Sequence, residues 1–412
     1  MSKRSVSIVF IIFIILSSFT IIIPLLAFIP FEYKYNDGPY LIWTDDPKTT
    51  MTIVWMTKDP ELGELKYGKY GRTPYYMETV FEMKYDTLHI IKLDNLNPDT
   101  SYFYKIPTLG KKIYRFKTAP DKIESFNFIV IGDIRQETIK RSAYDEIVEA
   151  IHPYEYEFVI NSGDLVDQAD DLESWHNFFS VMKKQAKDHP YMVAIGNHEI
   201  KENDEGLDFR DFFPYNYAHP PDYYYSFDYS NAHFVMLDNY DVPDSDGNYI
   251  SDEQKKWLSE ELDYNRDKWL FVVFHVPPYS TARYNMNEQL ISQLCPLFYE
   301  YEVDVVLNGH EHNYESFWVN KTEDWGGTFY FVSGGGGAPT SFDILDRKEN
   351  PWKHIWHNAS IEPYQNDYIT LHDQLYGELA FHFMYFEVND NTLHIQAIRE
   401  DGSLMQEFYI TK

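Results

Sequence analysis

The chain has 412 residues and a mass of 49.0 kDa, more than one typical domain requires. Its 65 acidic residues outnumber 35 basic ones, and the net charge of −30 at pH 7 argues against nucleic acid as a partner. A hydrophobic content of 44% indicates a folded core. The single cysteine, Cys295, excludes an internal disulfide and a cysteine-ligated zinc cluster, so any metal must be held by His, carboxylate and amide groups.

The N-terminal segment, residues 1–31, is predicted to be a transmembrane signal anchor. Lys3 and Arg4 precede an uncharged run of mostly Ile, Phe and Leu from Ser5 to Phe31, and a span needs about 20 apolar residues. The end of the run has no convincing small-x-small cleavage site, which favours an uncleaved anchor over a signal peptide. The positive-inside rule then places the rest of the chain on the extracytoplasmic side, as a membrane-anchored or, if the segment is cleaved, a secreted protein.

Residues 38–120 are expected to form a small all-β sandwich. Strand-like stretches recur at regular spacing, at residues 50–57, 63–70, 87–96 and 100–109. The sequence Leu96-Asn97-Pro98-Asp99-Thr100-Ser101-Tyr102 resembles the turn and tyrosine corner of fibronectin type III domains. Nothing in this segment has the spacing of catalytic groups, so it is interpreted as a spacer, lid or interaction module.

Residues 125–412 show the pattern of an α/β domain with a largely buried sheet. A first helix is predicted by apolar residues that recur every four positions, Ile139, Ala143, Ile147 and Ile151. A second helix is expected over residues 172–182, and a capping box at Ser251 begins a third. Residues 378–410 return to strands joined by hairpin turns. The other strands are predicted at residues 126–131, 157–161, 191–195, 234–237, 269–274, 304–307 and 328–332.

Five short motifs follow these strands, where α/β sheets place their ligands. Each carries a residue able to bind a hard or borderline metal, and four of the five carry a Gly that allows a sharp turn. Taken singly, a Gly-Asp pair is usually a turn and a lone His is usually a surface residue. Their occurrence in series at strand ends favours a metal site. The motifs are Gly132-Asp133, Gly163-Asp164, Gly196-Asn197-His198-Glu199, Phe274-His275 and Gly309-His310-Glu311-His312.

This series, after a fibronectin-like domain, resembles the calcineurin-like metallophosphoesterases and, within them, the purple acid phosphatase branch. The resemblance implies a four-layer αββα sandwich that holds two metal ions, with Asp164 bridging both. Asp133 and His312 would complete one site, and the other would be formed by Asn197, His275 and His310. These ligand types suit Fe, Mn or Zn and do not distinguish among them.

The chemistry expected of such a centre is the hydrolysis of phosphate esters. Two cations about 3.5–4 Å apart neutralise the phosphate and generate a metal-bound hydroxide that attacks it. His198, next to a predicted ligand, is the candidate general acid for the leaving group; the alternative role is orientation of the site.

Two positions depart from the family pattern. Purple acid phosphatases place a metal-ligating Tyr, the source of their colour, three residues after the bridging Asp, where this chain has Asp167. Related enzymes place a His two residues after the first Asp, where this chain has Arg135. Asp167 could ligate the metal directly or through water and Arg135 could contact the substrate phosphate, or the two could form a structural salt bridge.

The sequence thus predicts an outward-facing dinuclear phosphohydrolase that cleaves phosphate monoesters. Two alternatives remain open: a phosphodiesterase or nucleotide pyrophosphatase on the same centre, and a catalytically silent surface-binding protein, because the first metal site lacks one protein ligand. The expected partners are a small phosphate-ester substrate and, through residues 1–31, a membrane.

Overall fold

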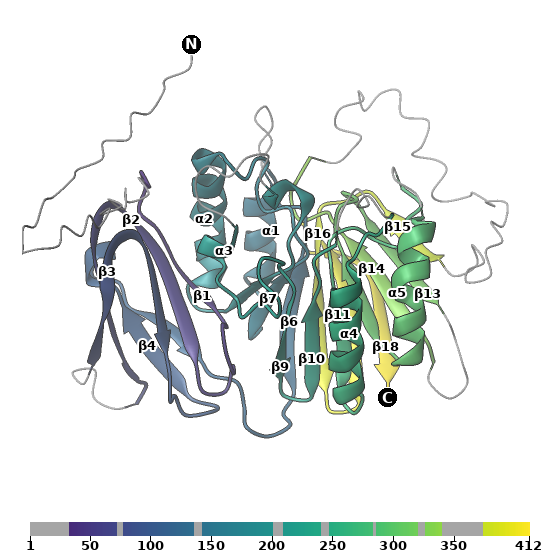
Figure 1. Ribbon diagram of the computed structural model, residues 1–412, viewed down its shortest axis with the longest axis horizontal. Coiled ribbons are helices and arrows are strands. Elements are labelled where there is room, and N and C mark those ends of the chain that lie inside the picture. Colours follow the sequence, from purple (N-terminus) through teal and green to yellow (C-terminus); the bar gives the residue numbers. More distant parts are fainter. Residues whose placement is uncertain are drawn as a thin grey trace, which may run out of the picture.

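The computed structural model describes residues 33–71, 77–135, 142–200, 209–239, 247–282, 286–319, 326–339 and 374–412. The predicted anchor, residues 1–31, lies outside these ranges and stays a prediction. In the described part of the chain, no helix is both long and apolar enough to cross a membrane. Figure 1 shows an N-terminal β domain beside a larger α/β domain.

The N-terminal domain is a five-stranded sheet in which a single long strand takes part in most of the pairing. β2 pairs with β1, β3 and β4, and β4 pairs with β5. The two strands expected at residues 50–57 and 63–70 are therefore one strand, because the bulges between them bend the chain without ending its pairing. The strands are β1 (Asp37–Ile42), β2 (Met51–Lys69), β3 (Glu78–Leu93), β4 (Ser101–Lys105) and β5 (Tyr114–Lys117).

Two local features tie this domain together and to its neighbour. The Tyr102 hydroxyl accepts a hydrogen bond from the backbone N–H of Asn97 at 2.8 Å, as the resemblance to a tyrosine corner implies. The Tyr104 hydroxyl donates to the carbonyl of Lys187 at 2.6 Å, and Tyr40 donates to the carbonyl of Phe212 at 2.6 Å. The two domains are thus joined by buried tyrosines as well as by the chain.

The α/β domain contains two mixed sheets. In the seven-stranded sheet, antiparallel strands flank the parallel strands on both sides, whereas in the six-stranded sheet they lie on one side only and a parallel strand forms the other edge. The first has the order β18 (Leu404–Thr411), β17 (Thr392–Arg399), β16 (His382–Asn389), β6 (Phe126–Ile131), β7 (Phe158–Asn161), β8 (Tyr191–Val193). The second has the order β15 (Gln374–Glu378), β13 (Tyr314–Val319), β14 (Thr328–Ser333), β12 (Val305–Asn308), β11 (Trp269–Val273), β10 (Ala232–Met236), β9 (Tyr225–Tyr229).

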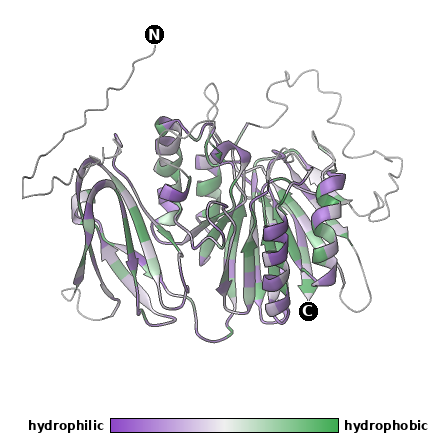
Figure 2. Cartoon of the chain, in the orientation of Figure 1, coloured by the Kyte–Doolittle hydropathy of each residue, from purple (hydrophilic) through white to green (hydrophobic). Residues whose placement is uncertain are grey.

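Helices cover the outer faces of both sheets, which gives the four layers implied by the family resemblance (Figure 1). α1 (Tyr144–Ile151) and α2 (Leu172–Ala186) lie on the first sheet, and α4 (Asp252–Tyr264) and α5 (Glu288–Glu300) pack on the second; α3 (Phe209–Phe212) is a single turn. Ser251 caps α4 as predicted, its hydroxyl accepting from the backbone N–H of Gln254 at 3.2 Å. Figure 2 shows hydrophobic central strands and a largely hydrophilic α4.

An aromatic core joins the two sheets. Phe128 of β6 stacks on Phe158 and Phe386 of its own sheet, with ring centroids 5.2 and 4.6 Å apart. It meets Phe234 and Phe271 of the other sheet edge to face, each at 5.3 Å. This packing fixes the separation of the two sheets. The predicted site residues follow the carboxyl ends of strands in both of them.

Replacing Phe128 by Leu should lower the free energy of unfolding by about 1–2 kcal/mol, because the aliphatic side chain loses the ring contacts and leaves a small cavity. Phe81→Leu is the control, since Phe81 is 60% exposed and its replacement should change the free energy little. Urea unfolding measures both. Equal effects of the two substitutions would show that the aromatic core does not hold the sheets together.

Candidate metal centre

All six predicted metal ligands lie just beyond the carboxyl ends of parallel strands. From the first sheet come Asp133 after β6, Asp164 after β7 and Asn197 after β8. From the second come His275 after β11 and, in the loop between β12 and β13, His310 and His312. The centre therefore lies at the carboxyl ends of strands from both sheets, where α/β sheets commonly bind their ligands.

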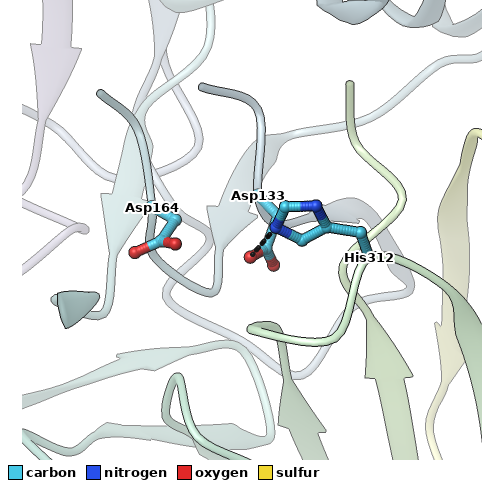
Figure 3. A group of neighbouring side chains, drawn as sticks. All are labelled: Asp133, Asp164 and His312. Atoms are coloured by element: carbon cyan, nitrogen blue, oxygen red, sulfur yellow. Dashed lines mark ion pairs between the residues drawn. The ribbon is translucent and has the colours of Figure 1, made fainter. Parts of the chain in front are cut away.

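One group of donors forms around Asp133. A ligand atom from each of Asp133, Asp164 and His312 lies within 4.8 Å of the other two, close enough to share one metal ion (Figure 3). Nε2 of His312 is 3.4 Å from Oδ1 of Asp133, and its Nδ1 donates to the carbonyl of Pro339 at 2.7 Å. That backbone contact fixes the ring so that Nε2 faces the aspartates.

A second group forms on the other side of Asp164. Nε2 of His275 lies 3.2 Å from Oδ1 of Asp164 and 3.1 Å from Oδ1 of Asn197. Nδ1 of His310 lies 3.2 Å from the same Asn197 oxygen. The His275 ring is held from behind, because its Nδ1 donates to the carbonyl of Ser162 at 2.8 Å. Asp164 thus lies between two sets of donors.

The backbone at these strand ends is unusual. Asp133, Asp164 and His310 have φ values of 54°, 57° and 68°, in the left-handed region that non-glycine residues rarely adopt and that concentrates at functional sites. Gly196 and Gly309 leave no room for a side chain: a Cβ at either would lie 2.4 Å from Oδ1 of Asp164 or from Oδ2 of Asp133. These glycines let the carboxylates approach the neighbouring loops.

The charges at the centre favour a cation. Oδ1 of the buried Asp133 has no hydrogen-bond partner among the described residues. Burial disfavours the charged form of His275, but the neighbouring carboxylate of Asp164 raises the pKa of His275 to about 10. In the absence of a metal, a proton on the imidazole therefore balances the charge of Asp164. Burial and the neighbouring His275 lower the pKa of His310 to about 4, which keeps that imidazole neutral and able to bind metal. The carboxylate, amide and imidazole donors therefore fit borderline metal ions.

His198, the predicted general acid, lies at the edge of this centre. Its Nδ1 donates to the carbonyl of Asp167 at 2.7 Å, so Nε2 points inward and lies 3.8 Å from Oδ2 of Asp164. The side chain is 28% exposed, which leaves it accessible to a substrate.

The two departures from the family pattern lie side by side. Nη1 of Arg135 donates to Oδ1 of Asp167 at 2.7 Å, and Nε of Arg135 is 3.6 Å from Oδ2 of Asp164. Asp167 is not among the clustered donors found in the described part of the chain. Of the interpretations left open by the sequence, the salt bridge is the one that this geometry favours.

Glu199 is a component of the centre to which the sequence analysis assigns no role. Its carboxylate is 1% exposed and accepts backbone N–H groups from both flanking loops. The donors are Asp164 and Gly196 at 2.9 Å, Leu165 at 2.8 Å and Val166 at 3.3 Å. Burial, and then repulsion from Asp164, raise the pKa of Glu199 to about 7. The sequence signal that could have pointed to Glu199 is its position directly after Asn197 and His198.

Comparison with known proteins identifies this arrangement. Residues 126–314 match the calcineurin-like phosphoesterase family, and residues 37–118 match the purple acid phosphatase N-terminal domain. Purple acid phosphatase 21 of Arabidopsis thaliana is 31% identical over 318 residues, covering 73% of this chain and 69% of that protein. The chain belongs to the purple acid phosphatase family. The predictions of the family and of a metallophosphoesterase are confirmed.

A second purple acid phosphatase agrees with this assignment, and two solved structures share the fold of the chain. Purple acid phosphatase 18 of Arabidopsis thaliana is 30% identical over 287 residues, covering 66% of this chain and 62% of that protein, just under two thirds of its length. The structure of the purple acid phosphatase PPD1 from yellow lupin shares the fold, with a TM-score of 0.68, 19% identity and coverage of 90% of this chain and 74% of that chain. The structure of PhoD has a TM-score of 0.60 at 13% identity, covering 93% of this chain and 94% of that chain.

An iron centre formed by this chain should be colourless, in contrast to the centres of purple acid phosphatases. The colour of purple acid phosphatases comes from a tyrosinate bound to ferric iron, and Asp167, paired with Arg135, occupies that position. Absorption spectra of the iron-reconstituted protein should lack a visible charge-transfer band. A purple product would mean that another tyrosine binds the iron, and would overturn the interpretation of Asp167.

Proposed function

We propose that the protein hydrolyses phosphate monoesters at a two-metal centre. Asp133 and His312 would hold one ion, Asn197, His275 and His310 the other, with Asp164 shared. The observation that carries the proposal is the convergence of these donors on both sides of Asp164 in a family of metal-dependent phosphatases. Bound ions would supply positive charge to the phosphate group and activate water at neutral pH.

The residues of the chain supply positioning and a proton. The carbonyls of Ser162 and Pro339 orient His275 and His312, and Glu199 fixes the loop that carries Asp164. His198 presents Nε2 towards the centre because its Nδ1–H is committed to Asp167. From there it can protonate the leaving alcohol oxygen as the ester bond breaks.

His198→Ala tests this role. The variant should keep both metals and lose turnover by about 10²–10⁴-fold on an alkyl monoester, whose leaving group needs a proton. On an aryl monoester with an acidic phenol the loss should be much smaller. Steady-state kinetics on both substrates, beside metal analysis, measure the difference. Equal losses on the two would mean that His198 only orients the centre.

The ester class is tested by comparing aryl monoester and aryl diester substrates. A monoesterase should favour the monoester in kcat/KM. Preference for the diester would establish the alternative of a phosphodiesterase on the same centre, since the metals activate water alike for both classes.

We further propose that the enzyme faces the extracytoplasmic side of a membrane that residues 1–31 span. The uncharged run from Ser5 to Phe31 and the preceding Lys3 and Arg4 support this topology. Protease added to intact cells should digest the catalytic domain. Its full protection, with digestion only after lysis, would contradict the proposed orientation.

A further inference from the structure

Exposed apolar side chains gather where β2 and β3 bend. Leu62, Phe81, Met83 and Tyr85 are 52, 60, 98 and 66% exposed, and Leu62 lies directly opposite Tyr85 in the paired strands. We refer to these four as the β2–β3 apolar patch. Single exposed apolar residues are ordinary, but a cluster of large ones commonly marks an interaction surface.

The patch lies near the point where the chain enters the folded domain. Oδ1 of Asn36 accepts a hydrogen bond from the backbone N–H of Lys58 at 2.8 Å, and Asp37 pairs with Met56. Lys58 stands at the start of the bend, in the stretch where the β2–β3 pairing is irregular. Figure 1 shows the two strands curving over together at this end of the domain.

The sequence leaves only a short linker between the predicted membrane span and this domain. The apolar run ends at Phe31, and Tyr33 is already buried: its hydroxyl donates to Oδ2 of Asp37 at 2.8 Å and its ring packs on Phe212 at 6.4 Å. The run is about seven residues longer than the about 20 that a span needs, and these residues together with Glu32 reach at most about 30 Å. A bilayer spanned by this run therefore lies within about 30 Å of Tyr33, which contacts both domains, so the N-terminal domain is within reach of its surface.

We propose that the β2–β3 apolar patch rests in the interfacial layer of that bilayer. The inference depends on the membrane anchor proposed above and is independent of the phosphatase activity. Phe81 and Met83 supply apolar surface, and Tyr85 combines a ring with a hydroxyl, the type of side chain that favours the headgroup region. The net charge of −30 selects a zwitterionic phospholipid surface over an anionic one.

Single-cysteine labelling of the full chain tests the contact. The native Cys295 does not interfere, because it is 1% exposed and burial raises the pKa of its thiol to about 11. Met83→Cys places an environment-sensitive fluorophore in the patch. Tyr264→Cys is the matched control, since Tyr264 is 87% exposed at the end of α4 in the other domain. Both proteins are reconstituted into phosphatidylcholine nanodiscs with and without a nitroxide-bearing lipid.

The nitroxide lipid should quench the label at position 83 several-fold more than the label at position 264, since an interfacial element lies about 5–10 Å into the headgroup boundary. Equally weak quenching at both positions in chains that remain in the nanodisc would overturn the proposal. A label at position 83 that is shielded from water but not quenched would also overturn it, in favour of a second copy of the chain. Failure of the chain to enter nanodiscs would overturn the anchor and this inference together, and leave the phosphatase proposal to its own assay.

Discussion

Replacing Asp164 by Asn should remove two-metal binding and turnover together. One oxygen of Asp164 faces His275 at 3.2 Å, and the other lies 3.6 Å from Arg135 and 3.8 Å from His198. The amide has the same shape but carries no charge and offers one ligand oxygen instead of two. The metal content should fall from two ions to at most one, and kcat by at least about 10³-fold, the scale of losing a principal electrostatic element of an active site.

Asp304→Asn separates this effect from a general loss of a buried carboxylate. Asp304 is also buried, accepts the backbone N–H of Leu270 at 2.8 Å and pairs with Lys412 at 2.8 Å, directly before β12 and outside the centre. Its variant should lose some stability but keep both metals and full turnover. Two bound ions and normal turnover in Asp164→Asn would show that Asp164 does not bridge.

Glu199→Ala should produce the largest loss of stability at the centre. The substitution leaves four buried backbone N–H groups, from Asp164, Leu165, Val166 and Gly196, without their acceptor. An unsatisfied buried donor costs about 1–3 kcal/mol, and partial solvation of the new cavity limits the total to about 3–5 kcal/mol of unfolding free energy. Urea unfolding of the metal-free protein measures it.

The metal content of the Glu199 variants distinguishes a positioning role from a purely structural one. Glu199→Gln keeps the volume and one acceptor oxygen, so it should lose less stability than Glu199→Ala. Because the loop that carries Asp164 is released, both variants should bind metal more weakly at 25 °C even where they are fully folded. Unchanged metal affinity in a folded variant would show that Glu199 does not position Asp164.

The order of the elements and the site loops was predictable because the sequence carries local signals for them. Apolar runs such as residues 126–131 and 304–307 predict strands, and a polar motif directly after each marks its carboxyl end. The side chains of Asp133 and His312 follow parallel strands of different sheets and meet only through tertiary structure, so their pairing was expected from the family resemblance and not from a local pattern.

Other features depend on contacts that no local pattern encodes. The predicted break in β2 is a bend, because bulges between Met56 and Glu64 curve the strand while pairing continues. α5 was not predicted, although Leu290, Leu294 and Phe298 recur at helical spacing; Pro296 within the segment weakens that signal. Glu199 could not be assigned a role, since three of its four partners are backbone groups of a loop more than thirty residues away.

The most direct test of the central claim is one preparation assayed for both metal and turnover. The full-length protein in detergent, reconstituted separately with Fe, Mn and Zn, is analysed for bound ions and for phosphate release from a simple aryl monoester. His310→Ala serves as the control, because it removes one donor beside Asn197. The account predicts two ions and turnover with at least one metal, and neither in the control. Turnover that survives His310→Ala, or a folded parent that binds no more than one ion and releases no phosphate with any metal, would contradict it.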